Sequence, residues 1–297
     1  MVALDSQPST ADHSSELQPP GTAAPLPIYL KRVWKMRHYA YASARRGIAS
    51  KNASNLLGNL WLLLEPAMLI GVYFVMFGLV VDISRGGVDF LPFLTVGMLV
   101  FTHNRRGIQL AAESLLTKAP MLKSFAFPRA ILPLIATLNA LFTFLVSLIV
   151  MFVVLPLLGT RPTLGWLWII PLTGAQVMLN LGLGMILARM VLRFADVRST
   201  LRYLFRLTIY ASGVIFPIQD YLAEMDNSNL YLNLALINPF YSITHLFRWA
   251  TLGTKPLTAN LMIVTTMIWC VGALLVGTVW FVRGERRYSG AKTLIKF

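Results

Sequence analysis

Three charged residues stand inside or directly beside apolar runs, and they are the strongest candidates for a chemical role in the sequence. Glu65, followed by the helix breaker Pro66, is the only charge in the run 61–81. Arg105 and Arg106 end a second apolar run. A charge at membrane depth has to face protein or water, because acyl chains cannot solvate it. We therefore predict that both arginines face an aqueous or lipid-headgroup cavity, whereas a proton relay usually needs more intramembrane ionisable groups.

A basic, aromatic stretch leads into the first apolar run. Residues 31–51 hold seven lysines and arginines, interleaved with Trp34, Tyr39 and Tyr41. This composition is typical of a helix that lies on an anionic membrane surface. The simpler interpretation is a membrane anchor with a positive flank, and the alternative is a surface with a functional role.

Signatures of several common enzyme classes do not occur. The sequence has no P-loop, H-E-x-x-H or G-x-S-x-G pattern. The single cysteine, Cys270, and the four scattered histidines lack ligand spacing, so no metal or cofactor is predicted in this chain. Asp196 is the only acid among the arginines of residues 189–206, and we expect it to pair with Arg193 or Arg198.

Composition indicates an all-α polytopic membrane protein. Of the 297 residues, 56% are hydrophobic and 13% charged, and the mean hydropathy is +0.65. The net charge of +14 comes from basic flanks of apolar runs, which points to membrane topology rather than nucleic acid. We predict six transmembrane helices within residues 60–283, at about 60–81, 90–112, 130–158, 163–188, 202–219 and 257–282.

The other segments complete this topology. Residues 1–27 predict a disordered cytoplasmic tail, 28–59 an amphipathic interfacial helix, and 284–297 a second cytoplasmic tail. With six spans, only four of the 26 lysines and arginines lie outside, namely Arg85, Arg161, Arg248 and Lys255. A seventh span would move a basic tail outside, so both termini are predicted to be cytoplasmic.

Two connecting segments are unusually apolar. The region 220–250 contains an uncharged run broken at Asn238-Pro239, and we predict short re-entrant helices that dip into the outer leaflet. The loop 113–129 mixes apolar side chains with lysine and arginine. It is either a helix resting on the lipid surface or a docking helix for another cytoplasmic protein.

Aromatic side chains gather in the first and fifth predicted spans. Most aromatics in membrane proteins belong to packing or interfacial belts. An aromatic-lined conduit would, however, suit a glycan, because sugars stack on aromatic faces. The candidate lining residues are Tyr73, Phe74, Phe77, Tyr210 and Phe216.

The order of these motifs resembles the membrane subunit of ABC type-2 polysaccharide exporters, the family of O-antigen, teichoic acid and galactan permeases. The resemblance covers about residues 30–290. It rests on these motifs in order: LLGNLWLLLEP, VYFVMFG, LPFLTVGMLVF, LKSFAFPRAILPL, RFADV, SGVIFP and LINPFYSITHLFRWATLG.

The resemblance implies a transport subunit rather than an enzyme. It implies a homodimer in the bacterial cytoplasmic membrane, working with two separate ATPase subunits that bind ATP and Mg. The substrate would be a polysaccharide on a polyprenyl-pyrophosphate lipid.

The resemblance also implies roles for particular residues. A gate at the lipid headgroups would use Trp34, Arg37, Tyr41, Arg45, Arg46, Arg105 and Arg106. The ATPase would grip a coupling segment with Glu113, Leu116, Lys118, Lys123, Phe125, Phe127 and Arg129. The re-entrant exit would include Asn238, Pro239 and Phe240.

The chain departs from the family pattern at three places. Ala195-Asp196 stands where members usually have Arg-Asp, and Ser212-Gly213 where they often have Ser-Pro. Arg105 and Arg106 replace a stretch that is commonly apolar. Two alternatives stay open, an ABC type-2 exporter of a drug or lipid and a membrane-embedded glycosyltransferase. The latter would need catalytic acids, for which the candidates are Glu65, Glu113 and Asp196.

Overall fold

A computed structural model describes residues 25–51, 56–76, 90–118, 127–217, 235–254, 256 and 258–289. This described part of the chain is helical and contains no strand. Four of its helices are long and apolar enough to cross a membrane, at Gly58–Met76, Ile131–Leu157, Leu164–Arg193 and Ala259–Glu285. The chain is thus an all-α protein with several candidate spans, and the count of six remains a prediction.

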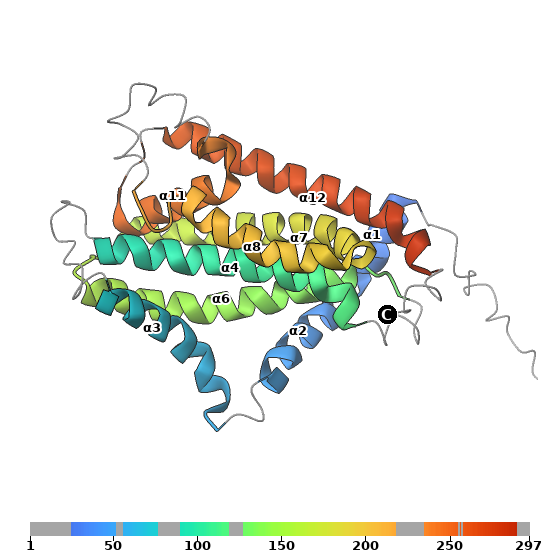
Figure 1. The fold of residues 1–297 in the computed structure, drawn as a ribbon, viewed down its shortest axis with the longest axis horizontal. Coiled ribbons are helices and arrows are strands. Elements are labelled where there is room, and N and C mark those ends of the chain that lie inside the picture. Colours follow the sequence, from blue (N-terminus) through green and yellow to red (C-terminus); the bar gives the residue numbers. More distant parts are fainter. Residues whose placement is uncertain are drawn as a thin grey trace, which may run out of the picture.

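Four long helices form the centre of the molecule. They are α4 (Phe90–Thr117), α6 (Ile131–Leu157), α7 (Ile169–Arg193) and α12 (Ala259–Ser289). In Figure 1 they run side by side, and α7 packs against both α4 and α12. A short 3-10 helix, η5 (Leu164–Trp168), precedes α7. The main core joins α4, α6 and α7 with α11 (Pro239–Leu252), through side chains such as Val100, Phe144, Leu179 and Phe247.

Glycine lets α7 and α12 approach very closely. A Cβ atom on Gly182 would collide with the backbone of Ala273, and one on Gly277 would collide with the backbone of Gly182. Small residues spaced four apart, such as Ala273 and Gly277, are a common device for packing membrane helices. At this point the two helices are therefore joined by direct backbone contact.

Replacing Gly182 with alanine is expected to destabilise the protein by about 1–3 kcal/mol, because the methyl group overpacks this contact. The matched control is Gly174→Ala on the same helix, where a Cβ meets nothing within 4 Å. There the higher helix propensity of alanine should be neutral or stabilising by up to about 1 kcal/mol. The unfolding temperatures of the two variants in detergent should therefore shift in different directions. Equal shifts would contradict the close contact.

The N-terminal part of the chain forms helices that branch from the bundle. They are α1 (Leu26–Lys35), α2 (Arg37–Lys51), η2 (Gly58–Leu60) and α3 (Trp61–Tyr73). In Figure 1, α2 and α3 form a V whose arms approach α6 and whose tip lies away from the bundle. Only Pro66 of α3 is buried, so this apolar helix leaves most of its surface open to lipid or to another chain.

A buried arginine fastens α11 (Pro239–Leu252) to α4 and to the end of α8 (Ala195–Ala211). The side chain of Arg248 is 1% exposed. It donates hydrogen bonds to the carbonyls of Phe93 at 3.1 Å, Gly213 at 2.8 Å and Val214 at 2.8 Å. Its guanidinium also lies 3.3 Å from the centroid of the Phe93 ring. The sequence analysis counted Arg248 as an outer-loop charge, but it belongs to the core.

Several predicted boundaries were wrong. The interfacial helix 28–59 is divided into α1 and α2, because the backbone at Met36 leaves helical geometry. Helix α4 passes through both arginines and ends at Thr117, so the predicted loop 113–129 begins inside a helix. The predicted fifth span, 202–219, is replaced by α8, which starts at Ala195 and ends at Ala211.

The end of α8 explains one departure from the family pattern. Gly213 follows α8 with φ of +59°. A proline at this position is excluded, because its ring holds φ near −65°. A Cβ at Gly213 would also lie 3.1 Å from the Tyr241 ring. Glycine here therefore shapes the corner at which Arg248 binds the two carbonyls.

Candidate functional site

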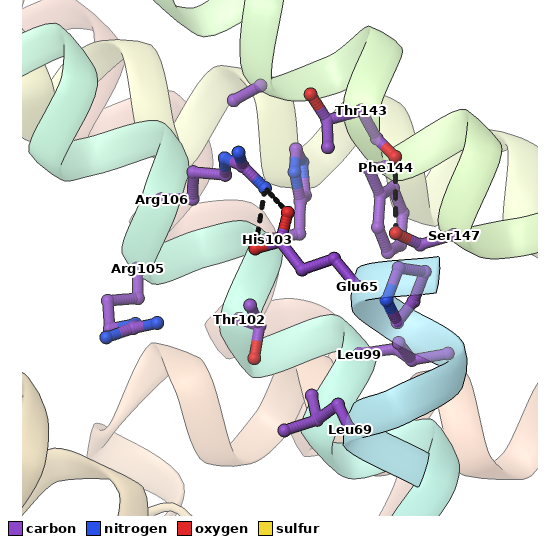
Figure 2. Close-up of a pocket in the computed structure, with 12 residues that line it drawn as sticks. Glu65, Leu69, Leu99, Thr102, His103, Arg105, Arg106, Thr143, Phe144 and Ser147 are labelled. Carbon is purple, nitrogen blue, oxygen red and sulfur yellow. Dashed lines mark hydrogen bonds and ion pairs between the residues drawn. The ribbon is translucent and has the colours of Figure 1, made fainter. Parts of the chain in front are cut away.

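A pocket of about 150 Å³ lies among α3, α4 and α6. Glu65, Pro66 and Leu69 contribute from α3, whereas Thr102, His103, Arg105 and Arg106 are among the residues from α4 and Thr143, Phe144 and Ser147 among those from α6. Figure 2 shows Glu65 and Arg106 pointing toward each other, with Arg105 directed elsewhere. The structure thus brings together the three charges that the sequence singled out.

Glu65 and Arg106 form an ion pair across this pocket. One guanidinium nitrogen, Nη1, lies 3.4 Å from Oε1 and 3.3 Å from Oε2 of Glu65. The side chain of Arg106 is 21% exposed, and that of Glu65 is 59% exposed. The partner of each residue was missed by the sequence analysis, because 41 positions separate them and no local pattern joins them.

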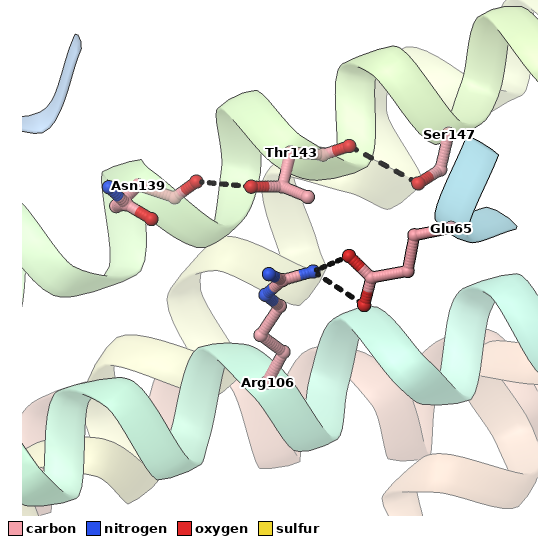
Figure 3. Close-up of polar contacts among 5 residues, drawn as sticks. All are labelled: Glu65, Arg106, Asn139, Thr143 and Ser147. Atoms are coloured by element: carbon pink, nitrogen blue, oxygen red, sulfur yellow. Dashed lines mark hydrogen bonds and ion pairs between the residues drawn. The ribbon is translucent and has the colours of Figure 1, made fainter. Parts of the chain in front are cut away.

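A line of polar side chains follows α6 beside this pair. Asn139, Thr143 and Ser147 are spaced four apart, so they share one face of an otherwise apolar helix (Figure 3). Thr143 and Ser147 each donate a hydroxyl hydrogen bond to the carbonyl four residues earlier, at 3.1 and 3.2 Å. Their oxygens keep accepting capacity. The four-residue spacing was a signal that could have revealed this face.

An aromatic contact forms the back of the pocket. The His103 ring stacks on Phe144, with centroids 4.2 Å apart and planes 13° apart. Asn180 of α7 lies behind it, with Nδ2 3.5 Å from His103 Nε2. Both His103 and Asn180 are buried. The pocket therefore has a rigid inner wall, whereas its outer wall is the exposed helix α3.

Arg105 lines the same pocket but points away from Glu65, and it lies near two of the candidate conduit aromatics. Tyr73 is close enough to interact electrostatically with both Arg105 and Tyr210. Three of the candidate aromatics are exposed, namely Tyr210 at 56%, Phe74 at 42% and Phe216 at 46%. The structure thus joins α3, α4 and α8 around Tyr73, while Phe77 falls outside the described residues.

Helix α2 is held against α6 by small side chains. Ala40 and Ala44 are fully buried, and Asn139 donates a hydrogen bond to the Ala44 carbonyl at 3.3 Å. The Tyr41 ring meets Phe142 edge to face at 5.2 Å. Arg45 and Arg46 are exposed on this helix. Among the described residues, no ion pair ties either arginine to the rest of the chain.

The gate candidates on α1 and at the start of α2 are also on the surface. Trp34 is 68% exposed, and Arg37 lies over its ring with the guanidinium carbon 5.3 Å from the centroid. Both residues are thus available to lipid headgroups. Tyr41 is 53% exposed as well, although its ring also contacts Phe142 of α6.

Helix α1 is joined to the start of α6 and to α12 through Tyr29. The backbone amide of Ala130 donates to the Tyr29 hydroxyl at 3.0 Å, and the amide of Arg129 donates to the Glu285 carboxylate at 3.0 Å. Burial and the nearby Glu285 carboxylate raise the pKa of the Tyr29 hydroxyl, so this group keeps its proton. One buried junction therefore links three elements.

The predicted coupling segment is described only at its two ends. Glu113, Leu116 and Lys118 lie at the end of α4, whereas Phe127 and Arg129 precede α6. Lys123 and Phe125 lie outside the described residues. Leu116 is 39% exposed, but Leu115 and Phe127 pack into the chain's own core with Tyr29. Part of the apolar surface of this segment is thus covered internally.

The expected pairing of Asp196 was wrong. Arg198 pairs with Glu113 of α4 instead, at 2.9 Å. The carboxylate of Asp196 lies in the first turn of α8, where the helix dipole favours negative charge. Since Arg198 is 55% exposed, this ion pair adds little stability.

The predicted exit residues lie where α8 meets α11. Asn238 caps α11 by accepting a hydrogen bond from the Phe240 amide at 3.0 Å, and Pro239 begins the helix. The Asn238 side chain also donates to the Ala211 carbonyl and the Ser212 hydroxyl, both at 3.1 Å. Phe240 packs edge to face on Phe101 and Phe205.

Comparisons with known proteins point to one class. No family model matches the chain. It is 26% identical over 164 residues to the O-antigen export system permease protein RfbA of Klebsiella pneumoniae, which covers 55% of this chain and 62% of that relative. It is 26% identical over 215 residues to the protein of the same name from Myxococcus xanthus, covering 72% and 80% respectively.

These similarities agree with the apolar helices of the fold. The matched region spans about 62% of the length of the Klebsiella pneumoniae relative and 80% of the Myxococcus xanthus relative. With four helices able to cross a membrane, the chain is a multi-pass membrane protein. The chain is accordingly a relative of the permease proteins of O-antigen export systems.

Proposed function

We propose that this chain is the transmembrane subunit of an ATP-driven ABC exporter. The exporter moves a polysaccharide linked to a polyprenyl pyrophosphate, such as O-antigen, across the bacterial cytoplasmic membrane. Two copies of the chain form the pathway, and separate ATPase subunits bind ATP and Mg on the cytoplasmic side, where both termini lie. The observation that carries this proposal is the similarity to two O-antigen export permeases.

Charge and aromatic placement support the lipid-linked glycan as the substrate. The exposed arginines of α2 offer guanidinium groups to phosphate, and arginine binds phosphate oxygens through paired hydrogen bonds. Farther along, Tyr73 and Tyr210 offer aromatic faces with polar ends, which suit sugars. Tyr73 of α3 and Tyr210 of α8 lie close enough to interact electrostatically.

The glycosyltransferase alternative gains no support from the acids. Glu65 and Glu113 are each engaged in an ion pair with arginine. Asp196 lies in the first turn of α8. A drug or lipid exporter of the same class is distinguished by its substrate, so the transport assay decides it.

The test is reconstitution with and without an ATPase partner. Purified alone, the chain should hydrolyse no ATP, because it has no P-loop. Together with the ATPase encoded beside it, proteoliposomes should hydrolyse ATP and move lipid-linked glycan, but no simple lipid or drug. Hydrolysis by a verified single-component sample, or glycan movement without any ATPase, would overturn the proposal.

A further inference from the structure

The Glu65–Arg106 ion pair is weakly made. Hydrogen bonds between a guanidinium and a carboxylate usually measure about 2.7–2.9 Å. Here the distances are 3.3 and 3.4 Å, and a single nitrogen of Arg106 faces both oxygens. The carboxylate is 59% exposed and belongs to α3, the helix with a single buried residue. Glu65 can therefore leave Arg106 without disturbing the core.

Arg106, in contrast, has a fixed position and unused donors. Its side chain is 21% exposed on α4, a helix packed against α6 and α7. A guanidinium has five N–H groups, and in the described structure only those of Nη1 have a partner. A partly buried cation on a membrane helix is stabilised by an anion beside it. Glu65 supplies that anion while the pocket holds no other.

The pocket has room and polar walls for a second anion. Its volume of about 150 Å³ far exceeds the roughly 15 Å³ that one water molecule requires. The hydroxyls of Thr143 and Ser147 line it beside the ion pair. A hydroxyl can turn its proton from a helix carbonyl to an incoming oxygen. Phosphate groups fit the same guanidinium geometry as carboxylates.

The polar face of α6 connects this pocket to α2. Asn139 bonds the backbone of α2 at Ala44, and Thr143 and Ser147 continue the same face to Glu65 (Figure 3). A charged group arriving at the exposed Arg45 and Arg46 thus meets a run of polar side chains that leads to Arg106.

We propose that Arg106 is an anion site for a phosphate or pyrophosphate group, and that Glu65 occupies this site as an exchangeable internal carboxylate until the group displaces it. The inference rests on the proposed function, since it identifies where the headgroup of a lipid-linked substrate binds after α2. Displacement also breaks the ion pair between α3 and α4, while Leu69 and Tyr73 of α3 keep their apolar contacts.

The experiment measures binding of inorganic pyrophosphate and of geranylgeranyl pyrophosphate to the full chain in lipid nanodiscs by calorimetry. Glu65→Gln removes the competing carboxylate, so affinity should rise about tenfold over the natural chain, within the usual range of coupling between sites. Arg106→Gln should lower affinity at least about tenfold. Arg161→Gln, a change at an exposed arginine of the α6–η5 connection, is the matched control and should leave affinity unchanged.

The two variants separate exchange from a purely structural ion pair. A structural pair loses the same contact in both variants, so it predicts similar changes in affinity and in thermal unfolding. Exchange predicts opposite changes in affinity. Unchanged or weaker binding by Glu65→Gln, undiminished binding by Arg106→Gln, or no binding by any variant would overturn the proposal.

Two further comparisons assign the source of the anion and separate this inference from the export function. Tighter binding of the lipid pyrophosphate supports a headgroup site, whereas equal binding supports a site for the free anion. If Glu65→Gln does not tighten binding but ATPase-dependent glycan export is observed, only the exchange fails. If the affinities change as expected but no glycan moves, the anion site stands and the export function fails.

Discussion

Arg248→Met is expected to remove most of the folded protein. The change keeps a long apolar side chain but leaves the buried carbonyl oxygens of Gly213 and Val214 without their guanidinium donors. It also removes the additional donor from the carbonyl of Phe93, which lies inside α4. Each unsatisfied buried group costs about 1–3 kcal/mol, so the loss is a large fraction of the roughly 5–15 kcal/mol that stabilises a typical domain. The unfolding temperature in detergent should fall by more than about 10 °C, and the monodisperse peak should be lost in size-exclusion chromatography.

Two controls show whether the hydrogen bonds are responsible. Arg248→Lys keeps the charge but cannot bind three carbonyls from one planar group, so its stability should be intermediate. Arg161→Met removes an exposed arginine and should change little. A melting temperature of Arg248→Met within about 3 °C of the natural chain would show that the buried guanidinium does not hold these helices together.

The double variant Arg45→Ala/Arg46→Ala should abolish export while the protein stays folded in the membrane. Helix α2 is held by Ala40, Ala44 and the Asn139 hydrogen bond, none of which involves the two arginines. Loss of general attraction to anionic lipid costs about 1 kcal/mol for each residue, which matters little in a multi-pass protein. If the arginines recruit the pyrophosphate headgroup, transport of lipid-linked glycan should fall at least about tenfold.

The matched control removes the same charge from α1. Arg32→Ala/Lys35→Ala also deletes two exposed basic residues, so general lipid attraction predicts equal effects for the two double variants. Recruitment predicts that only the α2 variant loses export and the stimulation of the partner ATPase by lipid-linked glycan. Export is compared at equal amounts of protein in the membrane. Normal export by Arg45→Ala/Arg46→Ala would show that the basic helix only anchors the chain to the membrane.

Local patterns in the sequence predicted the helices that depend on local causes. Uncharged runs longer than a bilayer indicated α6, α7 and most of α12. The break predicted at Asn238-Pro239 falls at the start of α11, where the asparagine caps the helix and the proline stands in its first turn. The predicted second span, 90–112, includes Arg105 and Arg106, and α4 passes through both. These features depend on residues within one or two helical turns.

Features that depend on distant partners could not be predicted in the same way. Arg248 has the type and flank of an outer-loop residue, and only the folded corner at Gly213 makes it a core residue. Arg198 had an acid two positions away, yet Glu113 of another helix is its partner. Packing places α4 beside α8, and the charge pattern within one segment cannot identify a partner on another helix.

The Tyr29 junction has a mechanical consequence. Its two backbone hydrogen bonds measure 3.0 Å, so they allow about 0.5 Å of stretch before they are lost. A pull on residues 127–130 larger than this either carries α1 and the end of α12 along or breaks the junction. A displacement of residues 127–130 is thus transmitted to α1 through the Tyr29 hydroxyl and to α12 through the Glu285 carboxylate.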